Sequence, residues 1–135
     1  MKKYAVLLIM SLVLTGCGKK TDYVKSMVLD EKNITVETDD IEDVEVRVEI
    51  EGNASREVTA VSSDPSLVSV EAWEDDEEIG LSYVDLETFE STGEAEITIT
   101  TVGKDKNDKE ITEKVKVTVV DTPLEDDEDD EDEDE

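Results

Sequence analysis

The side chains that most often perform catalysis are nearly absent from this chain of 135 residues. It contains no His and a single Cys, Cys17. This excludes nucleophilic systems that pair Ser or Cys with His, zinc sites of ordinary composition, and haem held by His. Asp and Glu number 40, so a carboxylate pair at a useful spacing arises by chance and does not indicate a glycosidase. We therefore expect a protein that is not an enzyme and has no cofactor.

Calcium is the one metal that this composition suits, because Ca²⁺ takes oxygen ligands. Residues 74–78, residues 105–110 and the acidic C-terminal tail are the oxygen-rich segments. The candidate ligands inside the domain are Asp75, Asp76, Asp105 and Asp108. None of these segments has the spacing of an EF-hand loop or the glycine that its sharp turn needs. The alternative to a specific calcium site is diffuse condensation of cations on the tail.

Three aromatic residues, Trp73, Tyr83 and Phe89, form a candidate patch for binding carbohydrate or peptide at one end of the domain. The alternative is that they belong to the hydrophobic core, since Trp73 follows Ala72, which we expect to be buried. The sequence permits both interpretations.

The first residues have the order of an export signal. Lys2 and Lys3 provide a positive start, and residues 4–14 are apolar except for Ser11. Eleven residues in a helix cover roughly 16 Å, about half of the hydrocarbon thickness of a membrane. A stretch of this length is typical of a removable signal peptide rather than a membrane span, so we predict a cleaved signal peptide over residues 1–16.

The end of this signal, Leu14-Thr15-Gly16-Cys17, resembles the lipobox of bacterial lipoproteins. The resemblance implies cleavage between Gly16 and Cys17, a diacylglyceryl thioether on Cys17, and usually a third acyl chain, such as palmitate, on the new amine. Two or more acyl chains give stable anchoring, whereas one chain holds only marginally. An ordinary signal peptide followed by an incidental Cys is the alternative.

These features predict a protein anchored by lipid at the extracytoplasmic face of a cell membrane, with residues 17–23 as lipidated Cys and linker. Gly18, rather than Asp, follows Cys17, so the sequence has no inner-membrane retention signal of the Gram-negative kind. A Gram-positive plasma membrane is the favoured location, and an outer membrane is the alternative.

The charge balance is strongly acidic, at −27 for the whole chain. Loss of Lys2 and Lys3 with the signal makes it −29, and the last eleven residues, 125–135, are all Asp or Glu. Such a charge repels the phosphates of nucleic acid, which we exclude as a partner. Residues 121–135 have almost no apolar side chain and repel one another, so we predict a disordered acidic tail.

Strict alternation of apolar and polar residues predicts β-strands in the middle of the chain. The alternating runs are residues 44–50, 95–100 and 114–119. Period 2 places their apolar side chains on one face, as in antiparallel sheets with one solvated side. Weaker strands are expected at residues 24–29 with 34–36 as a split first strand, 58–62, 67–72 and 81–86. Strands at intervals of about ten residues predict an all-β sandwich of about seven antiparallel strands over residues 24–120.

Three segments of this region resemble bacterial Ig-like domains of group 2. They are Ser62-Ser63-Asp64-Pro65-Ser66-Leu67-Val68-Ser69-Val70, Gly93-Glu94-Ala95-Glu96-Ile97-Thr98-Ile99-Thr100, and the closing run of residues 115–120. The resemblance implies an Ig-like sandwich of the kind found in surface proteins and adhesins, without binding residues that carry over.

The function predicted from these observations is that of a membrane-anchored, non-catalytic binding or accessory module. Its partner is expected to be an envelope protein or another basic partner, toward which the acidic tail steers it. A charged structural spacer without a specific ligand is the first alternative, and a calcium-responsive surface module is the second.

Overall fold

The computed structural model describes residues 21–121, which form a β-sandwich and contain no helix. The predicted signal peptide, Gly16, Cys17 and residues 122–135 of the tail lie outside the described residues. The strands are β2 (Tyr23–Leu29), β3 (Asn33–Glu37), β4 (Ile41–Glu51), β5 (Val58–Ser62), β6 (Val68–Glu74), β7 (Leu81–Thr88), β8 (Gly93–Lys104) and β9 (Glu110–Val120). Because these eight strands form two complete sheets around one core, a chain that begins at Gly18 contains the whole domain and is expected to fold on its own.

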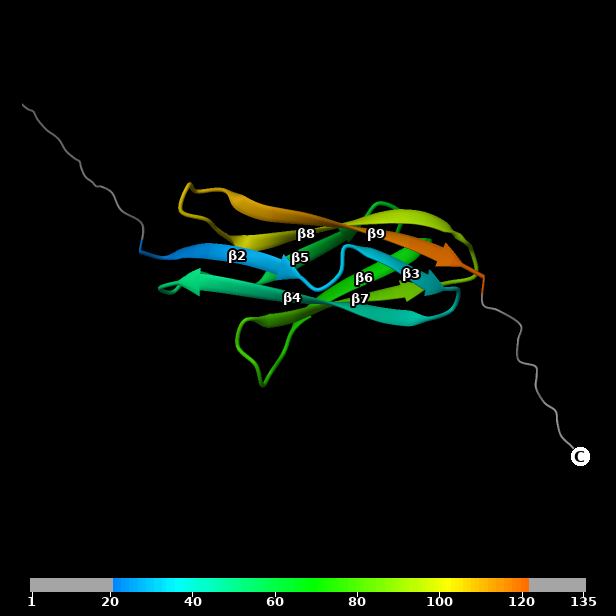
Figure 1. Cartoon of the computed structure of the whole chain (residues 1–135), viewed down its shortest axis with the longest axis horizontal. Helices are drawn as coiled ribbons and strands as arrows, with labels where there is room; N and C mark the ends of the chain where they lie inside the picture. Colours follow the sequence, from blue (N-terminus) through cyan, green and yellow to red (C-terminus); the bar gives the residue numbers. More distant parts are fainter. Residues whose placement is uncertain (1–20, 122–135) are drawn as a thin grey trace, which may run out of the picture.

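The strands form two sheets of four that pack face to face (Figure 1). One sheet has the order β2-β4-β7-β6, and the other has the order β3-β9-β8-β5. The predicted all-β, Ig-like sandwich is confirmed. The structure has eight described strands rather than about seven, because the two halves of the expected split strand, β2 and β3, belong to different sheets.

One pairing departs from the antiparallel arrangement that the alternation predicts. β3 pairs in parallel with β9, in the register Ile34 to Val117 and Val36 to Val119. The chain leaves β2 at Asp30, whose backbone amide donates to the carbonyl of Glu45, and then passes to the opposite sheet. Since β3 continues in the direction of β2, it meets β9 running the same way.

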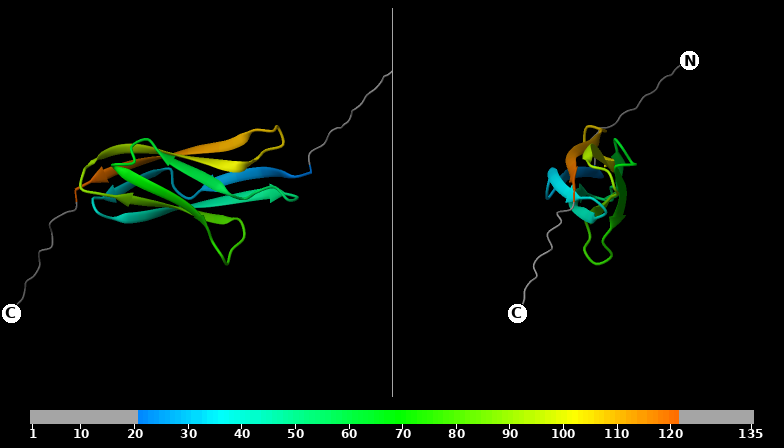
Figure 2. Two further views of the ribbon diagram at one scale, coloured as in Figure 1. Left: turned by 180° about the vertical axis from the view of Figure 1, so that it is seen from behind. Right: turned by 90° about the vertical axis from the view of Figure 1, so that its right-hand side faces the viewer.

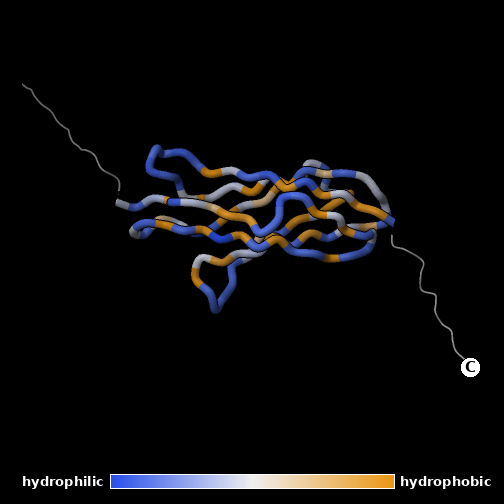
Figure 3. The backbone as a smooth tube through the Cα atoms, in the orientation of Figure 1, coloured by the Kyte–Doolittle hydropathy of each residue, from blue (hydrophilic) through white to orange (hydrophobic). Residues whose placement is uncertain are grey.

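The core consists of the inward-facing side chains of both sheets. In β4, Val44, Val46 and Val48 are buried and the intervening residues face outward. β8 and β9 bury Ala95, Ile97 and Ile99, and Val115, Val117 and Val119, in the same way. The hydropathy of successive residues alternates accordingly along the strands (Figure 3). Aliphatic residues and Met27 make up this cluster among the described residues, so the aromatic side chains are left for other positions.

The sandwich is elongated, and the described chain enters and leaves it at opposite ends (Figure 1). β2 begins at one end, here called the N-terminal pole, and β9 finishes at the other, the C-terminal pole. The segments at the C-terminal pole, residues 37–42, 62–68, 87–94 and 119–121, contain no Lys or Arg. Five of the nine basic residues in the described range lie at the N-terminal pole, namely Lys25, Arg56, Lys104, Lys106 and Lys109. The domain is therefore polarised in charge along its long axis.

Candidate functional site

Two of the three aromatic residues singled out from the sequence lie together on the surface. Trp73 of β6 is directly opposite Tyr83 of β7, and their rings stack with centroids 4.7 Å apart at 29°. Trp73 remains 44% exposed. The pair is therefore a surface feature and not part of the core, and the stack contributes roughly 0.5–1.5 kcal/mol beyond the area that it buries.

The third aromatic residue does not join this pair. Phe89 follows the last residue of β7, six positions beyond Tyr83. At about 3.4 Å per residue, it lies about 20 Å farther along the strand, at the C-terminal pole. The structure thus brings together Trp73 and Tyr83 and leaves Phe89 apart.

Carboxylates surround the aromatic pair on the outer face of this sheet. Asp85 of β7 is directly opposite Asp43 of β4 on one side and Glu71 of β6 on the other. The next row of the sheet holds Glu45 beside Tyr83 and Trp73. Like charges directly opposite each other destabilise a sheet, by roughly 0.2–1 kcal/mol per pair. This face therefore carries a concentrated negative charge at a cost to stability.

The environment of the Tyr83 phenol reflects this charge. Its partial burial, followed by the negative charges of Glu45, Asp75, Asp43 and Glu78, raises the pKa of Tyr83 above its ordinary value of 10.0. Both causes act against the phenolate, because burial and nearby carboxylates each disfavour a further negative charge. Tyr83 is a neutral hydrogen-bonding group at neutral pH.

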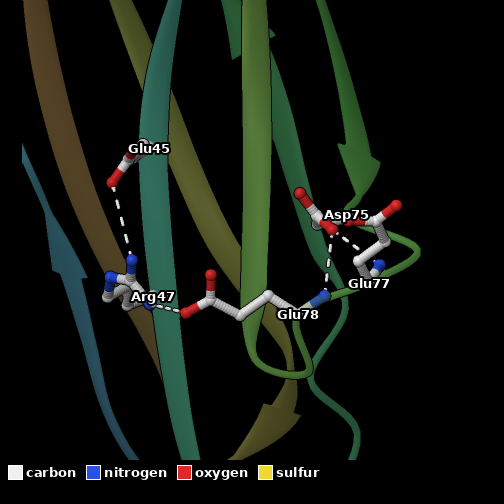
Figure 4. Close-up of polar contacts among 5 residues, drawn as sticks. All are labelled: Glu45, Arg47, Asp75, Glu77 and Glu78. Atoms are coloured by element: carbon white, nitrogen blue, oxygen red, sulfur yellow. Dashed lines mark hydrogen bonds and ion pairs between the residues drawn. The ribbon is translucent and has the colours of Figure 1, made fainter.

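The loop between β6 and β7, residues 75–80, is held against the sheet by polar contacts. Oδ1 of Asp75 accepts hydrogen bonds from the backbone amides of Glu77 and Glu78, at 2.7 and 2.9 Å. Figure 4 shows Arg47 of β4 reaching this loop, where its Nη1 donates to Oε2 of Glu78 at 2.7 Å. The hydrogen bond with Glu78 and its negative charge raise the pKa of Arg47 further above its usual value. The Arg47 contact fixes the loop beside the aromatic pair.

A cleft opens between the two sheets where β5 and β6 separate. These strands follow one another through residues 63–67 and diverge toward the N-terminal pole (Figure 2). Two adjoining hollows, of about 340 and 440 Å³, lie in this opening and share Glu57, Glu74 and Ser82 in their walls. The smaller hollow is completed by Val58, Ala72 and Trp73. The larger one extends along Arg56, Asp75 and the β6–β7 loop.

Ser82 lies in the wall common to both hollows, on the inward face of β7. Its neighbours on that face, Val84 and Leu86, are core residues, and Ser82 itself is only 2% exposed. Among residues 21–121, its hydroxyl has no hydrogen-bond partner. A buried hydroxyl without a partner is uncommon in folded proteins and calls for an explanation.

The carboxylates proposed as calcium ligands have other roles in the loops that contain them. Besides the two bonds of Asp75, Oδ1 of Asp105 accepts from the backbone amides of Asn107 and Lys109. Asp108 adopts a positive φ of 68° in the same turn, and Asp76 is exposed. Within the described part of the chain, no group of three or more Asp, Glu, His or Cys is arranged to hold a metal ion. The calcium site stays a prediction.

Sequence reasoning missed the cleft residues Glu57, Glu74 and Ser82. A signal existed for Ser82, because it occupies an inward position in the alternating run that continues with Val84 and Leu86. No local pattern marks the two glutamates, since only the separation of β5 from β6 brings them to one opening.

The comparisons with known proteins concern the fold. No family model and no curated protein matches the chain. Domains 4 and 5 of the S-layer protein SbsC are similar in structure, with a TM-score of 0.57 and 20% sequence identity over 76% of this chain and 55% of that chain. A structure of domains 1–6 of the same surface layer protein has a TM-score of 0.60 and 18% identity, over 78% of this chain and 14% of that one.

The chain thus spans about half the length of the first structure and about a seventh of the second. At these identities the likeness shows the fold alone, so membership of the group 2 bacterial Ig-like domains stays a prediction. Within residues 21–121, there is no helix with the length and apolar character needed to cross a membrane.

Proposed function

We propose that this protein is an exported lipoprotein whose Ig-like domain acts as a non-catalytic binding module close to the membrane. Lipid on Cys17 anchors the chain, and β2 begins only six residues later, at Tyr23. A linker of this length reaches about 20 Å when fully extended. The N-terminal pole is therefore held near the membrane surface, and neighbouring envelope proteins are the partners within reach.

The polarity of the domain is the observation that carries this proposal. The pole that adjoins the anchor holds five of the nine basic residues of the described chain, whereas the opposite pole has none. The same pole also carries carboxylates, among them Asp22, Glu51, Glu57, Asp105 and Asp108, so it is less acidic than the opposite pole rather than positive. Acidic head groups attract each nearby basic residue by about 1 kcal/mol and repel carboxylates, so of the two poles the N-terminal one is repelled less. With the anchor at the N-terminal pole, the acidic tail leaves from the far end, where it attracts basic partners from solution.

The structural neighbours support an extracytoplasmic role. Both are domains of one surface layer protein, SbsC, and have the same fold. The absence of His from the sequence and the commitment of Cys17 to lipid support a module without catalysis.

The anchor is tested by replacing Cys17 with Ala in the full-length chain and fractionating cells that express it. We expect the unmodified chain in the membrane fraction and Cys17→Ala in the soluble or secreted fraction. Retention of Cys17→Ala in the membrane would refute lipid anchoring.

The binding role is tested by affinity capture from envelope extract at about 0.15 M salt, an ionic strength that screens charges beyond about 8 Å. Residues 18–135 and residues 18–124 serve as parallel baits. A partner retained by both baits supports binding by the sandwich, and a partner lost with the tail supports electrostatic capture. Retention of nothing by either bait would contradict a binding module.

The second candidate function is that of a spacer, which one observation favours. The described chain enters at one pole and leaves at the other (Figure 1), with β9 alone covering about 37 Å over its eleven residues. Such a domain holds the segments attached to its two poles apart. Saturable capture that survives moderate salt would count against a purely structural role.

A further inference from the structure

We infer that the cleft between β5 and β6 binds the guanidinium of an arginine side chain from a basic partner protein. The inference deepens the proposed binding function and rests on it. It assigns the contact to the smaller hollow, to whose wall Glu57 contributes from the side of β5 and Glu74 from β6.

The charge of the hollow selects a cation. Its ionisable residues are Glu57 and Glu74, and no basic residue contributes to its wall. Neither glutamate forms an ion pair within the described part of the chain. Two carboxylates on facing walls repel anions and can each accept a hydrogen bond from one cation placed between them.

The unpartnered hydroxyl of Ser82 is the second, independent observation. Ser82 is only 2% exposed and lines the hollow together with Glu57 and Glu74. Glu74 is its direct cross-strand neighbour. An N–H group that enters the hollow finds in Ser82 an acceptor that the domain itself does not use, and this would explain a polar residue at a core-facing position.

The remaining walls suit the stem of arginine. Val58 and Ala72 provide an apolar lining for the methylene groups, which arginine buries readily. The ring of Trp73 stacks on Tyr83 on the outer face of the sheet, opposite to the face of Ser82, so it is a nearby reporter and not a contact of the guanidinium. The guanidinium of arginine is planar and carries five N–H donors, so it fits two carboxylates and one hydroxyl better than the compact ammonium of lysine does.

The surroundings steer such a partner toward the hollow. The adjoining larger hollow holds Asp75 together with the cation Arg56, and the row of Asp43, Asp85 and Glu71 crosses the outer face of the sheet, so the surroundings are acidic on balance. These charges act at longer range than the hydrogen bonds and accelerate the approach of a basic surface.

The test uses residues 18–135 and the pentapeptide acetyl-Gly-Gly-Arg-Gly-Gly-amide at about 0.15 M salt. Binding is followed by the emission of Trp73, the only Trp of the chain, and by backbone amide shifts in nuclear magnetic resonance. We expect a saturable change with the largest shifts at Glu57, Glu74 and Ser82. The same peptide with citrulline in place of arginine, which removes the charge and keeps the shape, should give no saturation.

Two double variants of equal net charge separate the hollow from general electrostatics. Glu57→Gln with Glu74→Gln should weaken the arginine peptide at least tenfold. Glu42→Gln with Glu90→Gln, at the C-terminal pole, should change the affinity less than twofold, and Ser82→Ala should weaken it about threefold with an unchanged fold.

Equal weakening by the two double variants, saturation by the citrulline peptide, or shifts centred on another face would overturn the inference. A further experiment distinguishes failure of this inference from failure of the proposed binding function. It uses the chain with both Glu57→Gln and Glu74→Gln as bait in the envelope capture, beside the unmodified chain. If both baits capture the same partner equally and the arginine peptide does not bind, the inference about the cleft is refuted and the proposed binding module is retained. If neither bait captures a partner, the proposed binding function is refuted as well.

Discussion

Thr88, at the end of β7, holds the turn between β3 and β4 through its hydroxyl. The hydroxyl accepts a hydrogen bond from the backbone amide of Asp40 at 2.9 Å and donates to the carbonyl of Glu37 at 2.6 Å. Thr88 is 2% exposed. The turn also contains Asp39 at a φ of 55°, a region that residues other than glycine rarely adopt. The contacts of Thr88 offset this local cost.

Replacing Thr88 with Val keeps the side-chain shape and the strand preference and removes only the hydroxyl. Each lost hydrogen bond costs about 1 kcal/mol, and a backbone group left without a partner adds about 1 kcal/mol where water cannot reach it. The free energy of unfolding should therefore fall by about 2–3 kcal/mol. For a domain of about 100 residues this lowers Tm by about 10 °C.

The measurement is urea and thermal unfolding of residues 18–135, with Thr35→Val as the matched control. Thr35 is an exposed strand residue of β3 near the same turn, and its hydroxyl has no hydrogen bond among the described residues. The control should change stability by less than about 0.5 kcal/mol, as surface substitutions usually do. If Thr88→Val cost no more than the control, the turn would not depend on the hydroxyl, and the reasoning would be refuted.

Two further predictions concern the outer face of the β2-β4-β7-β6 sheet. Asp85→Asn removes repulsion from both Asp43 and Glu71, so it should raise the free energy of unfolding by about 0.5–1.5 kcal/mol in urea titrations at low salt. The gain should shrink in high salt, because salt screens the repulsion. An unchanged urea midpoint would contradict repulsion within this row of carboxylates. Tyr83 has its pKa raised in the folded state, so its contribution to stability is complete below about pH 10 and is lost as the pH rises through the higher folded pKa. Urea midpoints should therefore fall less steeply above pH 10 in Tyr83→Phe than in the unmodified chain, and identical slopes would argue against the shift.

The strands could be predicted because alternation is a local property of the chain. Val44, Val46 and Val48 must share a face whatever lies opposite, and the structure buries all three. The sheet in which a strand takes part is not local. Ile34 and Val36 alternate like any half-buried strand, and nothing in their own sequence indicates a parallel partner in β9.

The candidate site was less predictable for the same reason. Trp73 and Tyr83 meet because β6 and β7 pair in one particular register, and a shift by one residue would place them on opposite faces. Phe89 has the same outward parity as Tyr83 and is excluded only because it lies beyond the end of β7. The cleft depends on how far β5 and β6 diverge, which neither strand encodes alone.

The placement of charge in this domain is better explained by binding than by solubility. Solubility requires only that carboxylates be spread over the surface, and the ion pairs of Lys114 with Glu96 and of Lys116 with Glu94 show how the β8–β9 face intersperses both signs. The face with Asp43, Asp85 and Glu71 does the opposite, because it stacks like charges in register beside an exposed aromatic pair. Repulsion of that kind lowers stability in the free protein and would be relieved by a bound cation, so the basic partner that we propose would gain affinity from the same residues that weaken the fold. A spacer would gain nothing from this arrangement. The binding module and the spacer are therefore separated by one property, which is whether an arginine-bearing ligand stabilises the domain more than salt of the same ionic strength does.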